Sequence, residues 1–146
     1  IANPLDRVRR PAFTMKLSGV GAFGQKKPHS IWAGVSASPD LYALQGEIDG
    51  ICRRLRLPPD PRKFTPHVTL ARLKNSNPRD VAGYLSARGN FASVPFSIGR
   101  FVLMSSRASF GGGPYIIEET WPLVGAEYDR QSNFESSASE ASRIIW

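Results

Sequence analysis

The stretch Phe64–Lys74, FTPHVTLARLK, constrains the fold of this chain more than any other. Pro66 disfavours a helical conformation in the residue before it, so Thr65 should be extended and the segment should begin as a strand. The run that follows is rich in β-branched residues and short enough for a buried strand. Because successive side chains of a strand point to opposite faces, we predict that His67 and Thr69 project from the same face of a sheet.

An imidazole and a hydroxyl two residues apart on a strand suit phosphate-ester chemistry. Thr69 can donate a hydrogen bond to an anionic oxygen, and His67 can take or give a proton near neutral pH. A histidine at the start of a strand is also commonly a surface or hydrogen-bonded structural residue. On this pair alone, both interpretations stay open.

Four stretches of the sequence together resemble a known family. The segment PHVTLAR resembles the second His-x-Thr motif of the 2H phosphoesterases, in particular the LigT-like RNA 2′,3′-cyclic phosphodiesterases, also called 2′-5′ RNA ligases. Three flanking stretches occur in the family's order and at about its spacing: LSGVGAFG (Leu17–Gly24), IWAGV (Ile31–Val35) and FVLMSSR (Phe101–Arg107). The resemblance implies an α+β fold, with antiparallel sheets and helices on their outer faces.

The resemblance also implies a reaction and residue roles. In the family, one histidine protonates the leaving oxygen, another activates water, and the two threonines hold the non-bridging oxygens of the phosphate. The substrate would be RNA with a 2′,3′-cyclic phosphate end, or a cyclic nucleotide, hydrolysed to a 2′-phosphate without metal or cofactor. On this chain, the resemblance assigns catalysis to His67 and Thr69.

Arg72 stands where the family carries an arginine that helps to hold the substrate phosphate. Strict alternation along the strand points Arg72 away from His67. A bulge, the end of the strand or a long reach would be needed to bring its guanidinium to the phosphate. An ordinary exposed strand arginine is the alternative.

The first His-x-Thr motif of the family is absent from this sequence. The chain has two histidines, His29 and His67, and only His67 has a threonine two residues on. We expect His29 at the surface. In one explanation, the part that carries the other motif lies upstream of Ile1, which the Ile1 start and the mid-pattern beginning of the resemblance favour. In the other, the protein is an inactive relative that binds RNA ends or nucleotides.

Charge and composition fit an anionic partner. The net charge is +7, and residues 1–74 hold 13 Lys and Arg against 5 Asp and Glu. A basic half attracts phosphates, although a solvated basic face would have the same composition. A binding module could also stack RNA bases on aromatic side chains that we expect to be exposed: Phe13, Phe23, Trp32 and Tyr115. No His, Cys, Asp and Glu cluster has metal-ligand spacing.

The length of 146 residues predicts one domain, which we assign to residues 1–124, followed by a polar, Ser-rich tail at 125–146. Cys52 is the only cysteine, so no intrachain disulfide can form, and a reducing compartment such as the cytoplasm is expected. No apolar run has transmembrane length, so we expect no membrane partner. We expect a monomer.

Helices are expected after two capping signals. Ser38 followed by Pro39 predicts a helix whose apolar stripe continues to Leu55, and Asn77 followed by Pro78 predicts a second helix. Strands are expected at Phe13–Leu17, Ile31–Val35, Phe96–Ser105 and Tyr115–Trp121. A loop is expected at Gly19, Gly21 and Gly24.

Overall fold

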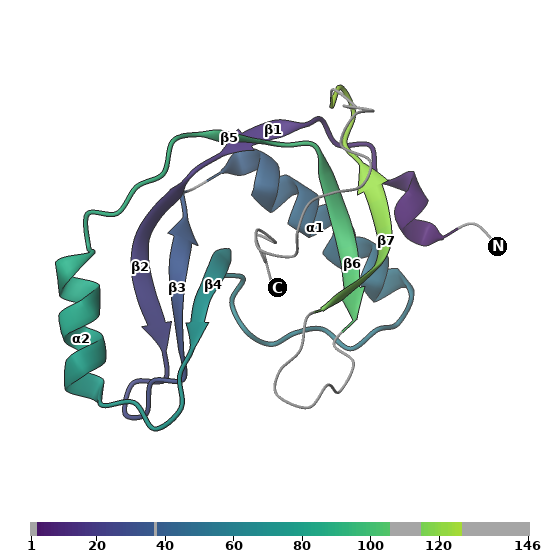
Figure 1. Cartoon of the computed structure of the whole chain (residues 1–146). Helices are drawn as coiled ribbons and strands as arrows, with labels where there is room; N and C mark the ends of the chain where they lie inside the picture. The colour runs from purple at the N-terminus through teal and green to yellow at the C-terminus, as the bar shows by residue number, and fades with distance from the viewer. Residues whose placement is uncertain (1–2, 37, 106–114, 127–146) are drawn as a thin grey trace. The chain divides into compact units, whose positions relative to one another are not determined.

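The structure is a computed structural model that describes residues 3–36, 38–105 and 115–126 (Figure 1). The described residues form two compact units. The first unit comprises 3–14, 39–59, 97–105 and 115–126, and the second comprises 15–36, 38 and 60–96. The polar tail beyond residue 126 and the segment Ser106–Pro114 lie outside the described residues.

The second unit is built on an antiparallel sheet of three strands in the order β2-β3-β4 (Figure 1). These strands are β2 (Leu17–Phe23), β3 (Ser30–Val35) and β4 (His67–Arg72). β3 is central, and its Ile31 and Ala33 are 7% and 0% exposed. One face of the sheet is therefore buried.

Helix α2 (Pro78–Ala87) belongs to the same unit and packs against β2. Its start is the predicted one: the side chain of Asn77 accepts a hydrogen bond of 2.9 Å from the backbone N–H of Arg79. Val81 is the buried residue of this helix. The cap and the first-turn proline thus fix where the helix begins, and burial of Val81 holds it to the unit.

The prediction that Gly19, Gly21 and Gly24 form a loop is wrong for the first two glycines, which lie within β2. Gly19 has a positive φ of 73° and lies where the pairing of β2 with β3 shifts its register, a position that suits glycine. Gly21 pairs with Trp32, and a Cβ at Gly21 would come within 2.3 Å of the indole. These glycines accommodate a bulge and a large ring rather than a turn.

The first unit contains helix α1 (Pro39–Arg54), a 3-10 helix η1 (Pro4–Arg7) and a two-stranded antiparallel sheet. Leu41, Leu44 and Ile51 of α1 are buried, as the predicted stripe requires. The prediction that Leu55 continues the stripe is wrong, because Leu55 follows the last helical residue and is 51% exposed. The stripe ends where the helix ends.

The single strand predicted at Phe96–Ser105 is broken at Gly99 into β5 (Phe96–Ile98) and β6 (Arg100–Ser105). β5 pairs with β1 (Phe13–Met15), whereas β6 pairs with β7 (Ile116–Pro122). The Gly99 carbonyl accepts a hydrogen bond of 2.8 Å from the Leu123 N–H. The break therefore lies where the chain changes pairing partner. The antiparallel sheets and two helices confirm the expected α+β class.

None of the helices in the described part of the chain has both the length and the apolar character needed to cross a membrane.

Candidate active site

Strand β4 carries all three residues that the sequence singles out, and its pairing with β3 extends beyond the strand's two ends. The Val35 N–H donates to the Pro66 carbonyl (3.3 Å), and the Leu73 N–H donates to the His29 carbonyl (2.8 Å). The paired segment thus spans residues 66–73. Residues 63–66, which lead into it, are not helical, as expected of a chain in which the residue before proline avoids the helical region.

The register between β3 and β4 decides which side chains share a face. In an antiparallel pair, residues directly opposite each other project to the same side of the sheet. On β4, His67, Thr69 and Arg72 lie opposite three residues of β3 that alternate along it: Gly34, Trp32 and Ser30. The three side chains of β4 therefore project from one face, which we call the site face.

A β-bulge explains why Arg72 joins that face despite its odd spacing from Thr69. Trp32 lies opposite Thr69, but the next residue of β3, Ile31, lies opposite Ala71, so Leu70 is an extra residue in β4. A bulge resets the alternation of the strand that carries it and re-aims the following side chains. Arg72 is consequently on the side of His67, by the first of the three routes that the sequence leaves open.

The imidazole of His67 is held by the backbone just before it. Its Nδ1 lies 2.6 Å from the carbonyl oxygen of Thr65. A carbonyl oxygen can only accept a hydrogen bond, so Nδ1 carries the proton and donates it. In the neutral ring, Nε2 is then the nitrogen with the lone pair, available for a proton or a ligand.

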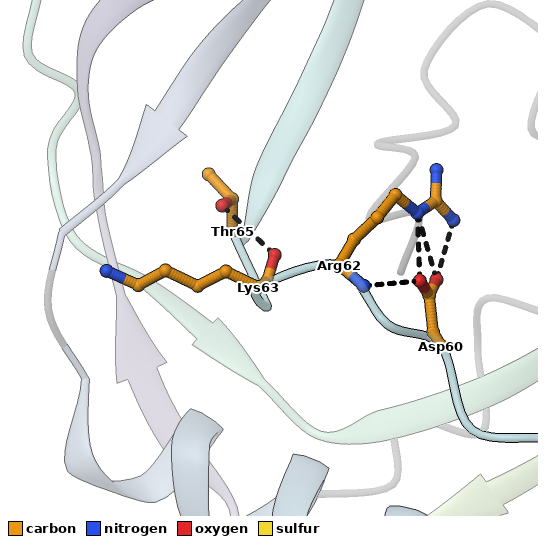
Figure 2. A network of polar contacts seen from close by, with 4 residues as sticks. All are labelled: Asp60, Arg62, Lys63 and Thr65. Carbon is orange, nitrogen blue, oxygen red and sulfur yellow. Dashed lines mark hydrogen bonds and ion pairs between the residues drawn. The ribbon is translucent and has the colours of Figure 1, made fainter.

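The segment leading to His67 is stabilised by its own polar contacts, which Figure 2 shows. The Thr65 hydroxyl donates to the Lys63 carbonyl (3.3 Å). Nε of Arg62 donates to both carboxylate oxygens of Asp60 (2.9 and 3.1 Å), Nη2 donates to one of them (2.6 Å), and the Arg62 backbone N–H adds a fourth bond (2.9 Å). These bonds lower the pKa of Asp60 to about 2 and raise the pKa of Arg62.

Two aromatic rings surround His67 on the site face. The Phe23 ring lies edge-on to the imidazole, with centroids 5.0 Å apart and planes at 82°. The Trp32 ring lies 6.1 Å from the imidazole and 5.5 Å from the Phe23 ring. Phe23, Trp32 and His67 form what we call the aromatic cluster.

The sequence does not predict the aromatic cluster. The prediction that Phe13, Phe23, Trp32 and Tyr115 are exposed platforms for RNA bases is wrong, because Phe13 is 8% exposed and the other three are half-buried. The available signal is the alternation of Gly21 and Phe23 in LSGVGAFG, which on a strand brings both to the same side. The loop expected at these glycines hides that signal.

His29 is exposed, as expected. Its ring stacks on Phe23 with centroids 6.4 Å apart and planes at 23°. It therefore borders the aromatic cluster, but Ile31 stands two residues after it where a His-x-Thr motif has threonine.

The site face thus offers a proton-transfer group, a neutral donor and a cation. Nε2 of His67 can exchange a proton, the Thr69 hydroxyl can donate to a phosphate oxygen, and the Arg72 guanidinium can donate two parallel bonds to a phosphate. In residues 3–36, 38–105 and 115–126, no three His, Cys, Asp or Glu side chains are grouped so that they could hold a metal ion.

Comparison of the sequence with known families and proteins gives consistent results. A family model described as LigT like Phosphoesterase matches residues 34–115. An RNA 2′,3′-cyclic phosphodiesterase of Aeropyrum pernix is 33% identical over 78 residues, which are 52% of this chain and 44% of that protein. A protein of the same name from Aquifex aeolicus is 28% identical over 119 residues, or 77% of this chain and 62% of the relative. This chain spans less than two thirds of the length of these relatives.

Solved structures with a similar fold include LigT of Escherichia coli, crystallised in complex with 3′-AMP. It superposes with a TM-score of 0.62 at 20% identity, covering 83% of this chain and 65% of that one. A crystal structure of a Thermus thermophilus protein gives a TM-score of 0.59 at 24% identity, covering 79% of this chain and 62% of the other. At these identities the likeness concerns the fold.

Proposed function

This chain belongs to the LigT-like phosphoesterase family, within the 2H phosphoesterases, and from that premise we propose that its site face is one half of an RNA 2′,3′-cyclic phosphodiesterase site. The substrate is RNA with a 2′,3′-cyclic phosphate end, or a cyclic nucleotide, and the product is a 2′-phosphate. Relatives that bear the name RNA 2′,3′-cyclic phosphodiesterase support this assignment.

The observation that carries the proposal is the shared face of His67, Thr69 and Arg72. A phosphodiester approaching this face meets an imidazole Nε2, a hydroxyl and a guanidinium together. The bond from Nδ1 of His67 to the Thr65 carbonyl fixes which ring nitrogen is available for proton transfer. These groups supply one proton-transfer group and two hydrogen-bond donors for a metal-free hydrolysis of a phosphate ester.

In the proposed reaction, the oxygen of water attacks phosphorus and the bond from phosphorus to the 3′ oxygen breaks. One histidine accepts the proton of water and another gives a proton to the leaving 3′ oxygen, which leaves a 2′-phosphate and a 3′ hydroxyl. His67 is one of these two proton-transfer groups. Thr69 and Arg72 donate hydrogen bonds to the non-bridging oxygens as negative charge develops on them.

The second proton-transfer group does not come from a second His-x-Thr motif within these 146 residues. The other histidine of the chain, His29, lacks the threonine of the motif. We propose that a first His-x-Thr motif outside these residues completes the pair in the active protein. The chain by itself should therefore have at most a small part of the activity of an intact relative.

The domain bounds, the oligomeric state and the location in the cell are part of the same proposal. Residues 1–124 are taken as the LigT-like domain and residues 125–146 as a polar tail. The protein is taken to act as a monomer in the cytoplasm, since its single cysteine, Cys52, suits a reducing compartment.

The proposal is tested by measuring hydrolysis of 2′,3′-cyclic AMP and affinity for 2′-AMP with the same set of variants. His67→Ala should abolish the slow hydrolysis while keeping most of the affinity, because the imidazole moves protons rather than holding the phosphate. Arg72→Ala should weaken 2′-AMP binding by about tenfold or more, the effect of losing a charged hydrogen bond. Arg79→Ala, at an exposed position in the first turn of α2, is the matched control for Arg72→Ala and should change neither quantity.

Three results would contradict the proposal. Hydrolysis as fast as that of an intact relative would show that a paired motif is not needed. Hydrolysis unchanged in His67→Ala would remove His67 from the reaction. Tight 2′-AMP binding with no hydrolysis in the unmodified chain would instead favour an inactive module that binds RNA ends or nucleotides.

A further inference from the structure

Among the described residues, the His67 side chain has one hydrogen bond to the backbone, from its Nδ1 to the Thr65 carbonyl. One hydrogen bond fixes the position of one ring atom, but the ring can still tilt about it. Proton transfer to a phosphate ester requires the opposite nitrogen, Nε2, to stay within hydrogen-bond reach of its target. A second restraint on the ring is therefore needed if Nε2 is to stay in one place.

The Phe23 ring supplies a contact of the right kind. Its centroid lies 5.0 Å from that of His67, with the planes at 82°. Aromatic rings prefer this edge-to-face arrangement at centroid distances of about 4.5 to 7 Å. Phe23 also contacts Trp32, whose ring lies 6.1 Å from the imidazole. The imidazole is thus in contact with two rings that also contact each other.

The position of Trp32 depends in turn on Gly21. A Cβ at Gly21 would lie 2.3 Å from Cζ2 of the indole, 2.4 Å from Cη2 and 2.9 Å from Cε2. Real Cβ atoms do not approach carbon atoms so closely, so the indole lies directly against the backbone of Gly21. Any side chain at Gly21 would push the indole away, and the other two rings of the aromatic cluster pack against that indole.

The indole N–H of Trp32 does not account for the position of the ring. Within the described residues, Nε1 of Trp32 is buried and has no hydrogen-bond partner. A buried donor without a partner is unfavourable, and such groups are rare in native structures.

Ordinary core packing does not account for the aromatic cluster. The buried face of this sheet is the opposite one, where Ile31 and Ala33 point. Phe23 and Trp32 are half-buried and share the site face with His67, Thr69 and Arg72. The rings therefore lie beside the reacting groups rather than in the core.

We propose that Gly21, Trp32 and Phe23 are positioning residues for the proposed phosphodiesterase reaction, which hold the His67 imidazole so that Nε2 faces the substrate phosphate. Gly21 admits the indole, the indole supports the Phe23 ring, and both rings restrain the imidazole. This inference rests on the proposed function, but the restraint itself is a property of the protein without substrate.

NMR of the 146-residue chain tests the restraint directly. In the unmodified chain, the imidazole ¹⁵N shifts of neutral His67 should report the tautomer protonated on Nδ1, with strong NOEs from its ring protons to Phe23. Weaker NOEs from the His67 ring protons to Trp32, whose ring lies 6.1 Å away, should accompany them. Gly21→Ala should weaken the NOEs to Phe23, Phe23→Leu should weaken the NOEs to Trp32, and both variants should mix the two tautomers. The residual hydrolysis of 2′,3′-cyclic AMP should fall by about fivefold or more, the order of effect expected for losing an aromatic pair.

Matched variants separate positioning from general loss of structure. Gly83→Ala is the control for Gly21→Ala, since a Cβ at Gly83 in α2 meets nothing within 4 Å. It should leave the His67 signals and the hydrolysis unchanged. Phe23→Tyr keeps the ring edge and should restore both readouts relative to Phe23→Leu. If Gly21→Ala does not fold, the two Phe23 variants still decide the question.

The two proposals fail in different ways. If Phe23→Leu leaves the tautomer of His67 and its NOEs to Trp32 as they are in the unmodified chain, positioning by the aromatic cluster is wrong, whatever the activity. If the NMR signals change as expected but His67→Ala leaves hydrolysis unchanged, the rings do restrain His67 and the proposed function is wrong.

Discussion

The sheets β2-β3-β4, in the second unit, and β6-β7, in the first, both contain an aromatic pair and a β-bulge, but the residues around these features differ. Each has an aromatic pair with ring centroids 5.0 Å apart. In β2-β3-β4 the pair is Phe23 and His67, edge-on at 82°, on a half-buried face. In β6-β7 it is Phe101 and Trp121, stacked at 13°, and Trp121 is 7% exposed. The first pair borders polar groups, whereas the second forms part of a core.

Each sheet also has a bulge. In β4 the extra residue is Leu70, and the bulge brings Arg72 to the face of His67 and Thr69. In β7 the extra residue is Glu118, whose carboxylate accepts a hydrogen bond from the hydroxyl of Ser105. In β4 the bulge thus brings a guanidinium to the face of an imidazole and a hydroxyl. In β7 the bulged residue has a hydrogen-bond partner on the neighbouring strand. The side chains that follow a bulge decide whether it has chemical consequences.

The largest effect is expected from removing the core ring of β6-β7. Trp121→Ala deletes a buried side chain, its stacking on Phe101 and the bond of 2.8 Å from its Nε1 to Asp6. We expect a loss of about 3 to 5 kcal/mol in the free energy of unfolding, measured by urea titration. Leu103→Ala is the control on the same sheet, because Leu103 is 47% exposed, and should cost less than about 1 kcal/mol.

That pair of variants checks whether the stacked rings are indeed the core of β6-β7. Equal, small losses in the free energy of unfolding for both variants would mean that the Trp121 side chain does not stabilise β6-β7. The contrast with the half-buried aromatic cluster of β2-β3-β4 would then fail.

A smaller effect is expected from moving the arginine of the site face by one residue. The double substitution Ala71→Arg with Arg72→Ala keeps composition and charge, but Ala71 lies opposite Ile31, on the side of the sheet away from the site face. Affinity for 2′-AMP should fall by about tenfold or more, as in Arg72→Ala alone. The measurement is isothermal titration of the folded variants.

Regular alternation would give the reverse outcome. Without the bulge, residue 71 would follow Thr69 on the site face, and residue 72 would point away. Affinity preserved in the double variant would therefore show that the strand is regular and that Arg72 is not on the face of His67.

Local signals in the sequence predict the elements that local chemistry determines. Asn77 and Pro78 predict the start of α2, and Pro66 with the β-branched run predicts β4, because a cap and a proline act within a few residues. The shared side of His67 and Thr69 follows from strand periodicity alone.

Features that depend on a distant partner cannot be predicted in the same way. The strand character of Gly19 and Gly21 depends on β3, and the close approach at Gly21 exists because Trp32 lies opposite it. The break at Gly99 reflects a change of pairing partner. The bulge at Leu70 has no local sequence signal, since register is a property of two strands. The position of Arg72 is therefore an open question from the sequence.

The shared site face of His67, Thr69 and Arg72 is tested by an NMR titration of the isotope-labelled chain with 2′-AMP, in which every assigned side chain is followed. We predict that the signals of these three residues shift together with a single dissociation constant. The signals of Phe101 and Trp121 in β6-β7 should stay in place. Saturable shifts confined to Phe101 and Trp121, with His67 unaffected, would contradict this prediction.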